Sequence, residues 1–293
     1  MRPVRSIGGS HCVWLFPRRI ILPKKRYRCY KLPGDERENS PVSPGVSAWE
    51  TENCLRQISN YIYCDDFIAD LRYETRLAAN PYYDYPYLVI ENFLSAEACA
   101  EIAAYTHEKS EGERAKVKKN RMGVVVPELE EDIRKTAIHR LPDVLLEGYH
   151  LSFAYYQKRI EDYFSAPLTT ATEVQALEYT KGGFYIKHAD DSNDLVNSEG
   201  ETVGFAQVAP ERKITTLLFA TSHREHGGEG LHFTGGELVF NYLFDADGRP
   251  VRIRPKAGDM VIFPSNPLYS HEVLPVTEGY RLTLVQWHDA IIT

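Results

Sequence analysis

The sequence predicts an α+β fold dominated by β structure, a sandwich or jelly roll with helices laid on one sheet. Two observations predict it. Two amphipathic helical patterns precede Pro167, and after it the chain changes to short apolar runs separated by Gly, Asp, Asn and Pro. With 293 residues, 43% of them hydrophobic, the chain can bury one large core or two small ones.

A short strand and two helices are predicted before Pro167. The apolar run 88–90 is typical of a strand, and the helix predicted over 96–109 follows Ser95, whose hydroxyl can cap its first turn. The second helix is predicted over 143–164, where apolar residues recur every three or four positions. Its apolar stripe consists of Leu145, Leu146, Tyr149, Phe153, Tyr156, Ile160 and Phe164.

The region after Pro167 is rich in β-branched and aromatic residues, which favour strands. Turn residues divide it into eight or nine runs of strand length. The predicted strands are 173–179, 183–188, 202–208, 213–220, 236–242, 250–254, 259–263, 270–274 and 280–287. This number of short strands after two helices favours two packed sheets.

The N-terminal region differs from the rest of the chain. Residues 1–40 carry ten Lys or Arg against three acids, whereas the whole chain has a net charge of −7. Because Pro and Gly interrupt any periodicity, we expect 1–50 to be a flexible basic extension, with a targeting peptide and an over-extended reading frame as alternatives. We expect 51–84 to be a helical, Tyr-rich lead-in, with helices within 54–78. The main domain is then 85–293.

The composition argues against several classes of protein. Phosphate binding needs a basic face, so a net charge of −7 argues against nucleic acid as the main partner. No apolar run approaches the roughly 18 residues of a membrane-spanning helix. The five cysteines are odd in number, lie in the first third and include no C-x-x-C pair. We therefore expect a cytoplasmic protein with neither nucleic-acid nor membrane partners; the oligomeric state is open.

Polar groups concentrate at three places in the β half. His188 and Asp190 lie two positions apart at the end of a predicted strand, so their side chains are expected to point the same way. His271 opens a later strand. Arg281 begins an apolar run in which a guanidinium requires an anionic partner, either a carboxylate or a phosphate.

Two imidazoles and one carboxylate form the facial triad of non-haem Fe(II) oxygenases, which leaves the opposite face of the metal open. The open positions suit 2-oxoglutarate and O2, and Arg281 suits the distal carboxylate of 2-oxoglutarate. A His-x-Asp pair alone is a weak signal. Its conjunction with Tyr179-x-x-Gly-x-x-Tyr before it, a distal His, an Arg ten residues later and a Trp six further is far more specific.

At these positions the sequence resembles the Fe(II)/2-oxoglutarate dioxygenases of the prolyl 4-hydroxylase catalytic-domain type, over roughly 85–293. The segments that carry the resemblance are Tyr87–Cys99, Arg212–Phe219, Gly235–Phe240, Pro255–Phe263 and His271–Trp287. The resemblance implies a double-stranded β-helix that holds the iron inside one end. It also implies Fe(II), 2-oxoglutarate and O2 as cofactor and co-substrates, with ascorbate as a candidate reductant.

The resemblance implies a role for each matching residue. The implied iron ligands are His188, Asp190 and His271, and Arg281 is the implied partner of the distal carboxylate. The remaining implied co-substrate contacts are Tyr179, Thr215, Leu217, Val273 and Trp287. Two departures stand out: Phe219 occupies a position where some relatives have a Tyr, and collagen-type prolyl hydroxylases are expected to carry Lys in place of Arg281.

The resemblance favours hydroxylation, because the carboxylate of Asp190 occupies the position that halogenating relatives leave open to chloride. The expected substrate is a prolyl or other residue of a protein or peptide. A free amino acid or small metabolite is the alternative substrate. A cupin-like metal-binding protein without redox activity and an interaction module that docks through its basic arm are the alternative functions.

Three further segments have two interpretations each. The polar stretch 191–211 is either a lid over the active site or a surface hairpin. The His- and Gly-rich segment 222–232 is interpreted as a solvated loop rather than a zinc site. The basic cluster within 116–121 either steers an anion or is a solvated loop, which is the favoured interpretation.

Overall fold

The structure is a computed structural model that describes residues 55–58, 62–65, 86–109, 113–114, 117–121, 124–128, 133–226 and 231–291. The predicted basic extension over 1–50 and most of the lead-in over 51–84 lie outside these residues. The side chains of the basic cluster within 116–121 lie outside them too.

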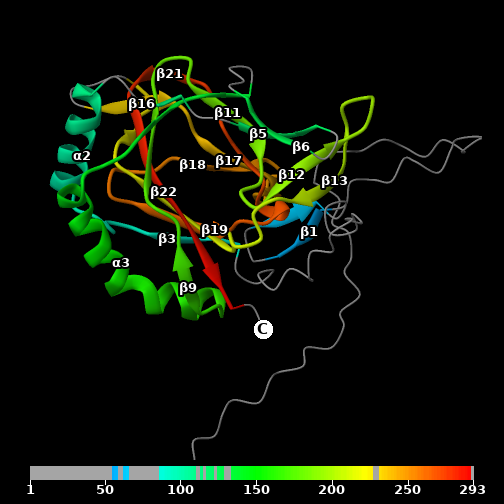
Figure 1. The fold of residues 1–293 in the computed structure, drawn as a ribbon, viewed down its shortest axis with the longest axis horizontal. Coiled ribbons are helices and arrows are strands. Elements are labelled where there is room, and N and C mark those ends of the chain that lie inside the picture. Colours follow the sequence, from blue (N-terminus) through cyan, green and yellow to red (C-terminus); the bar gives the residue numbers. More distant parts are fainter. Residues whose placement is uncertain are drawn as a thin grey trace, which may run out of the picture.

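Two mainly antiparallel sheets form the body of the molecule (Figure 1). Along one sheet the strands are β1 (Leu55–Gln57), β2 (Tyr63–Asp65), β17 (Leu238–Phe244), β20 (His271–Val273), β11 (Phe184–His188) and β7 (Arg134–Lys135), with β18 (Pro250–Ile253) also paired to β17. Along the other they are β3 (Leu88–Ile90), β19 (Met260–Pro264), β14 (Ile214–Phe219), β22 (Arg281–Ala290), β10 (Gln175–Tyr179), β8 (Ala137–His139) and β4 (Glu113–Arg114), with β9 (Leu168–Ala171) also paired to β22. The sheets are seven- and eight-stranded within the described residues. Side chains between them form the core of a mainly β fold.

Three smaller groups of strands complete the β structure. They are the hairpin β12 (Ser192–Val196) and β13 (Thr202–Gln207), the pair β5 (Val117–Arg121) and β6 (Val124–Glu128), and the set β15 (Ser222–His223), β16 (His232–Gly235) and β21 (Val276–Gly279). A short 3-10 helix, η1 (Pro267–Tyr269), leads into β20. It directs the chain back into the sheet at His271.

The helices α2 (Ala96–Glu108) and α3 (Asp143–Phe164) pack on the outer face of the eight-stranded sheet, on the left of Figure 1. The Ser95 hydroxyl accepts a hydrogen bond from the Ala98 amide at 3.2 Å, so the predicted cap is present. From α3, the Tyr149 hydroxyl donates to the Gln286 side chain of β22 at 3.1 Å. Both predicted helices are confirmed within one residue of their expected bounds.

Each of the nine predicted strands overlaps an observed strand. The prediction of helices within 54–78 is wrong for the residues described there, because β1 and β2 are strands. Cys64 of β2 pairs with Leu243 of β17, so this part of the lead-in extends the main sheet. The segment 222–232 is not simply a solvated loop either, since it contains β15 and the start of β16.

The polar stretch 191–211 contains the hairpin β12–β13, whose base is fixed to the body. The amide groups of Val208 and Ala209 both donate to the carbonyl of Asp191, at 2.8 and 3.0 Å. Further along, the Lys187 ammonium contacts the Asp194 carboxylate at 2.8 Å. Among the helices that the structure describes, none is long and apolar enough to cross a membrane.

Candidate metal centre

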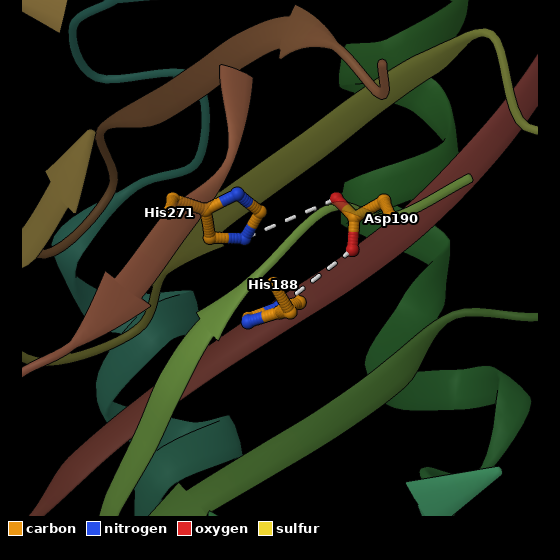
Figure 2. A group of neighbouring side chains, drawn as sticks. All are labelled: His188, Asp190 and His271. Carbon is orange, nitrogen blue, oxygen red and sulfur yellow. Dashed lines mark ion pairs between the residues drawn. The ribbon is translucent and has the colours of Figure 1, made fainter. Parts of the chain in front are cut away.

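The side chains of His188, Asp190 and His271 come together, with both imidazole rings close to the carboxylate (Figure 2). A one-residue bulge in β11 sets His188 directly opposite His271 of β20, and Asp190 follows two residues after β11 ends. The Nε2 atoms of His188 and His271 lie 3.9 and 4.0 Å from the two carboxylate oxygens of Asp190. This is the one group of three potential metal ligands found among the described residues.

Backbone carbonyl groups orient both imidazoles. Nδ1 of His188 lies 2.9 Å from the carbonyl oxygen of Ile186, and Nδ1 of His271 lies 3.0 Å from that of Tyr269. Each Nδ1 therefore carries the proton, so each Nε2 keeps its lone pair and faces Asp190. Burial lowers the pKa of His188 to about 3, so this ring is neutral, the form that binds a metal.

The Asp190 carboxylate is held in its charged form. Burial acts to raise its pKa, but a hydrogen bond from Thr215 and the positive charge of Arg212 act against burial, and the pKa is lowered. Thr215 Oγ1 donates to Asp190 Oδ2 at 2.6 Å. Since a threonine hydroxyl has a single proton, the Ser265 hydroxyl, 2.8 Å away, donates to Thr215. The two hydroxyls form a relay that ends on the carboxylate.

Arg281 is almost fully buried, with 1% of its surface exposed. Its guanidinium carbon lies 4.8 Å from the ring centroid of Tyr179, 5.2 Å from that of Phe219 and 5.6 Å from that of Phe233. Its Nε donates to the carbonyl of Gly236 at 2.8 Å. Among the described residues its Nη2 has no hydrogen-bond partner, and burial lowers its pKa to about 10.

A charged group buried in this way is costly unless an anion completes the site. The aromatic rings around Arg281 exclude water, and the unpaired Nη2 is a free donor for a carboxylate oxygen. Gly236 has a positive φ of 62°, and a Cβ at this position would lie 3.1 Å from Cδ of Arg281 and 2.8 Å from Val276. A glycine is therefore needed where the backbone approaches the arginine.

The inner face of β14 connects the metal centre to Arg281. Thr215, Leu217 and Phe219 alternate along this strand and share its inner face. Thr215 contacts Asp190 at one end, and the Phe219 ring lies against Arg281 at the other. The buried Leu217 lies between them, so a small molecule that spans this row reaches both the triad and the arginine.

The structure places the other predicted residues around the same space. Tyr179 is buried and pairs with Arg281 across β10 and β22. Val273 is buried and pairs with Tyr185 of β11. Trp287 pairs with Thr215 and lies under the Arg212 guanidinium, whose carbon is 4.0 Å from the indole. Thr215 lies on the same inner surface, and its hydroxyl donates to Asp190.

Sequence reasoning missed four residues of this region. They are Ser265, which supports Thr215; Phe233, which packs against Arg281; and the arginines Arg134 and Arg212 beside the triad. Arg212 follows a polar stretch and Arg134 lies on a two-residue strand, so neither arginine stands out against a regular pattern of apolar residues. Ser265 directly follows the strongly apolar β19, which is the one signal that it is buried for a reason.

The donor set fits Fe(II). Two neutral imidazole nitrogens and one carboxylate, all within 4.8 Å of one another, are the ligands of a facial triad. The fit to 2-oxoglutarate rests on Arg281, whose free donor lies at the far end of the same inner surface. The chemistry of the residues present therefore fits a metal ion at the triad and a carboxylate at Arg281.

Comparisons with known proteins agree with this chemistry. Residues 174–289 match the family model of the 2OG-Fe(II) oxygenase superfamily. A PKHD-type hydroxylase of Stutzerimonas stutzeri (strain A1501) is 30% identical over 114 residues, which are 39% of this chain and 42% of that protein. A PKHD-type hydroxylase of Variovorax paradoxus (strain S110) is 26% identical over 168 residues, 56% of this chain and 60% of that protein. The matches thus span about half the length of these curated relatives.

One solved structure supports the fold. A prolyl hydroxylase from Trichoplax adhaerens, in complex with a peptide fragment of the hypoxia inducible factor oxygen degradation domain, has a TM-score of 0.51 and 17% sequence identity. The likeness covers 72% of this chain and 86% of that chain. It agrees with the predicted double-stranded β-helix with helices on one sheet.

Proposed function

We propose that this chain, whose residues 174–289 belong to the 2OG-Fe(II) oxygenase superfamily, is a hydroxylase that uses Fe(II), 2-oxoglutarate and O2. In this proposal His188, Asp190 and His271 are the iron ligands, and Arg281 binds the distal carboxylate of 2-oxoglutarate. When bound, the iron and 2-oxoglutarate supply the oxidising chemistry, in which 2-oxoglutarate yields succinate and CO2 while a C–H bond becomes C–OH.

A single observation carries the proposal. The unpaired Nη2 of the buried Arg281 and the triad lie on one continuous inner surface, joined by the row of Thr215, Leu217 and Phe219. A cupin-like metal site without redox activity explains the triad alone. It leaves a buried, unneutralised guanidinium without a purpose, so it is the weaker interpretation.

Each residue has a defined part in the proposed reaction. The backbone carbonyls behind His188 and His271 keep Nε2 of each ring deprotonated and aimed at the metal. The relay from Ser265 through Thr215 fixes the Asp190 carboxylate. Phe219 offers no hydrogen bond, so the co-substrate carboxylate depends on Arg281, with Tyr179 stacked beside it. The aromatic wall excludes water, which strengthens that charged contact.

For the substrate we propose a prolyl or other residue of a protein or peptide. The Trichoplax relative with a bound peptide supports this kind of substrate through the shared fold. A free amino acid or small metabolite is the second candidate. We also propose a reducing, cytoplasmic location, because Cys99 is a buried free thiol.

The test follows succinate after anaerobic addition of Fe(II) and 2-oxoglutarate to the purified full chain and admission of O2. We expect Fe(II)-dependent succinate formation in the wild type, its loss in His188→Ala, and a large decrease in Arg281→Ala. Binding of 2-oxoglutarate to the metal-loaded protein is measured in parallel, because a tightly coupled enzyme can idle without substrate. A protein that binds metal but neither binds nor consumes 2-oxoglutarate would contradict the proposal.

A further inference from the structure

The helix α3 carries an exposed apolar stripe on the side that faces away from the sheet. Val144, Leu151 and Tyr155 are 75%, 67% and 80% exposed, the three highest values among the large hydrophobic residues that the structure describes. They follow one another at steps of seven and four residues, so they share one face of the helix. The opposite face packs on the eight-stranded sheet through Leu146, Tyr149, Ile160 and Phe164. An apolar stripe on the outer face of such a helix indicates a contact surface.

A hollow lies beside this stripe in the N-terminal half of α3. Its lining consists of Asp143, Val144, Glu147, His150 and Leu151. Tyr155 projects from the same face one turn beyond the hollow and is the most exposed large hydrophobic residue described. Along the helix axis, Tyr155 lies about 12 Å from Glu147, the central residue of the lining in the sequence. One helix thus offers both a projecting ring and a hollow, and its own ring cannot fill its own hollow.

An antiparallel pairing of two α3 helices brings the ring and the hollow together. If a two-fold axis passes beside Leu151, positions equally far before and after Leu151 face each other across the axis. Tyr155, four residues after it, then lies opposite Glu147 of the second copy, four residues before it, and enters that hollow. Leu151 packs on its own counterpart. A two-fold interface must be self-complementary, and this face has that property.

The charges of α3 suit the same arrangement. Asp143 lies eight residues before Leu151 and Arg159 eight residues after it, so each faces the opposite charge of the second copy. Both residues are exposed, and neither forms an ion pair with any described residue. Lys158 and Asp162 pair with each other at 2.7 Å within the helix, so they compensate one another. A parallel pairing would instead place like charges together, which is unfavourable.

We propose that the outer face of α3 is a homodimer interface, on which a second copy of this chain binds antiparallel about a two-fold axis at Leu151. The helix has 22 residues and is about 33 Å long. A contact of this size lies at the lower end of specific interfaces, below about 1,200 Å² in total. The dimer is therefore reversible, with a dissociation constant in the micromolar range. Because α3 lies on the outer face of the sheet (Figure 1), the dimer leaves the triad free, and the inference does not depend on the proposed function.

Sedimentation equilibrium of the full chain, from about 1 to about 200 µM, tests for a dimer of this strength. The average mass of the wild type should rise with concentration from that of one chain towards that of two. In Leu151→Glu two carboxylates meet at the axis, so the dissociation constant should increase about tenfold or more. Val196→Glu is the matched control, because Val196 is 61% exposed on the hairpin β12–β13. Its dissociation constant should equal that of the wild type.

A charge exchange tests the antiparallel register. Asp143→Arg and Arg159→Asp should each weaken the dimer several-fold at low salt, because each places like charges opposite one another. The double variant should recover the affinity of the wild type, since the reversed charges again face each other across the axis. Urea unfolding of each variant confirms that it is folded. Recovery in the double variant requires that the two positions meet in the dimer, which an effect on helix stability alone does not produce.

Three results would overturn the proposal. The first is a wild type that stays a monomer at every concentration; a lower free energy of unfolding in Leu151→Glu would then show that another segment of the same chain covers the stripe. The second is a dimer that Leu151→Glu and Val196→Glu weaken equally. The third is a double charge variant that dimerises no better than either single variant, which would exclude the antiparallel register.

Discussion

Substitution of Thr215 by Val tests how the Asp190 carboxylate is held. Valine has nearly the same shape as threonine but lacks the hydroxyl that donates to Asp190 at 2.6 Å and accepts from Ser265 at 2.8 Å. A hydrogen bond to a charged group contributes about 1.5–3 kcal/mol, which corresponds to a roughly 10- to 100-fold change in a dissociation constant. We expect the metal affinity of Thr215→Val to fall by an amount in this range, as for other residues that orient metal ligands.

The neighbouring residue offers a matched control. Thr216 is equally buried on the same strand but points to the outer face, where its hydroxyl donates to the Gln286 carbonyl at 3.1 Å. Thr216→Val should lower the free energy of unfolding by about 1–3 kcal/mol and leave metal affinity unchanged. Anaerobic Fe(II) titration and urea unfolding of both variants decide the matter. Equal metal affinity in Thr215→Val and the wild type would refute the relay.

Three further outcomes are expected. Burial lowers the pKa of His288 to about 4, whereas in the unfolded chain this side chain takes up a proton as the pH falls below 6.5. Between pH 7.5 and 5, the free energy of unfolding measured with urea should therefore fall by about 2 kcal/mol more in the wild type than in His288→Gln, and parallel curves would contradict this. Arg281→Lys keeps the positive charge but loses the two parallel N–H donors of the guanidinium, so the dissociation constant of 2-oxoglutarate should rise roughly tenfold while Fe(II) affinity stays unchanged. A change in Fe(II) affinity alone would argue against binding of 2-oxoglutarate at Arg281. Lys187→Met removes the contact to Asp194, so amide hydrogen exchange in 192–207 should accelerate, and unchanged exchange would show that other contacts fix the hairpin.

The elements predicted correctly from the sequence are those in which apolar residues recur at regular intervals because one face of the element is buried. The α3 stripe and the apolar strands of the β half face a core on at least one side, so their hydrophobic pattern reports their structure directly. The strands that were missed, such as β7, β12 and β15, are short or polar. The strand β7 pairs with the distant β11, whereas β12 and β15 pair with the strands that follow them, and none of the three has an alternating apolar pattern that a single sequence could reveal.

The same division applies to the site. His188, Asp190, His271 and Arg281 were identifiable because polar groups stand out against apolar strands. The bulge in β11 was not identifiable, although it sets His188 opposite His271 and stacks Tyr185 on His188. An extra residue in a strand changes which side chains share a face, and only the pairing with β20 reveals it.

Alternation along β22 assigns neighbouring residues to different tasks. The inner positions, such as Arg281 and Trp287, face the site, whereas Gln286 and His288 face α3, where His288 stacks on Phe153 with ring centroids 4.7 Å apart. The metal centre and the helix interface therefore share one strand without sharing side chains. Substitutions along β22 should alternate, with inner positions altering ligand binding at constant stability and outer positions altering stability at constant binding. An engineered inner residue can then change what the site binds while α3 continues to hold the sheet.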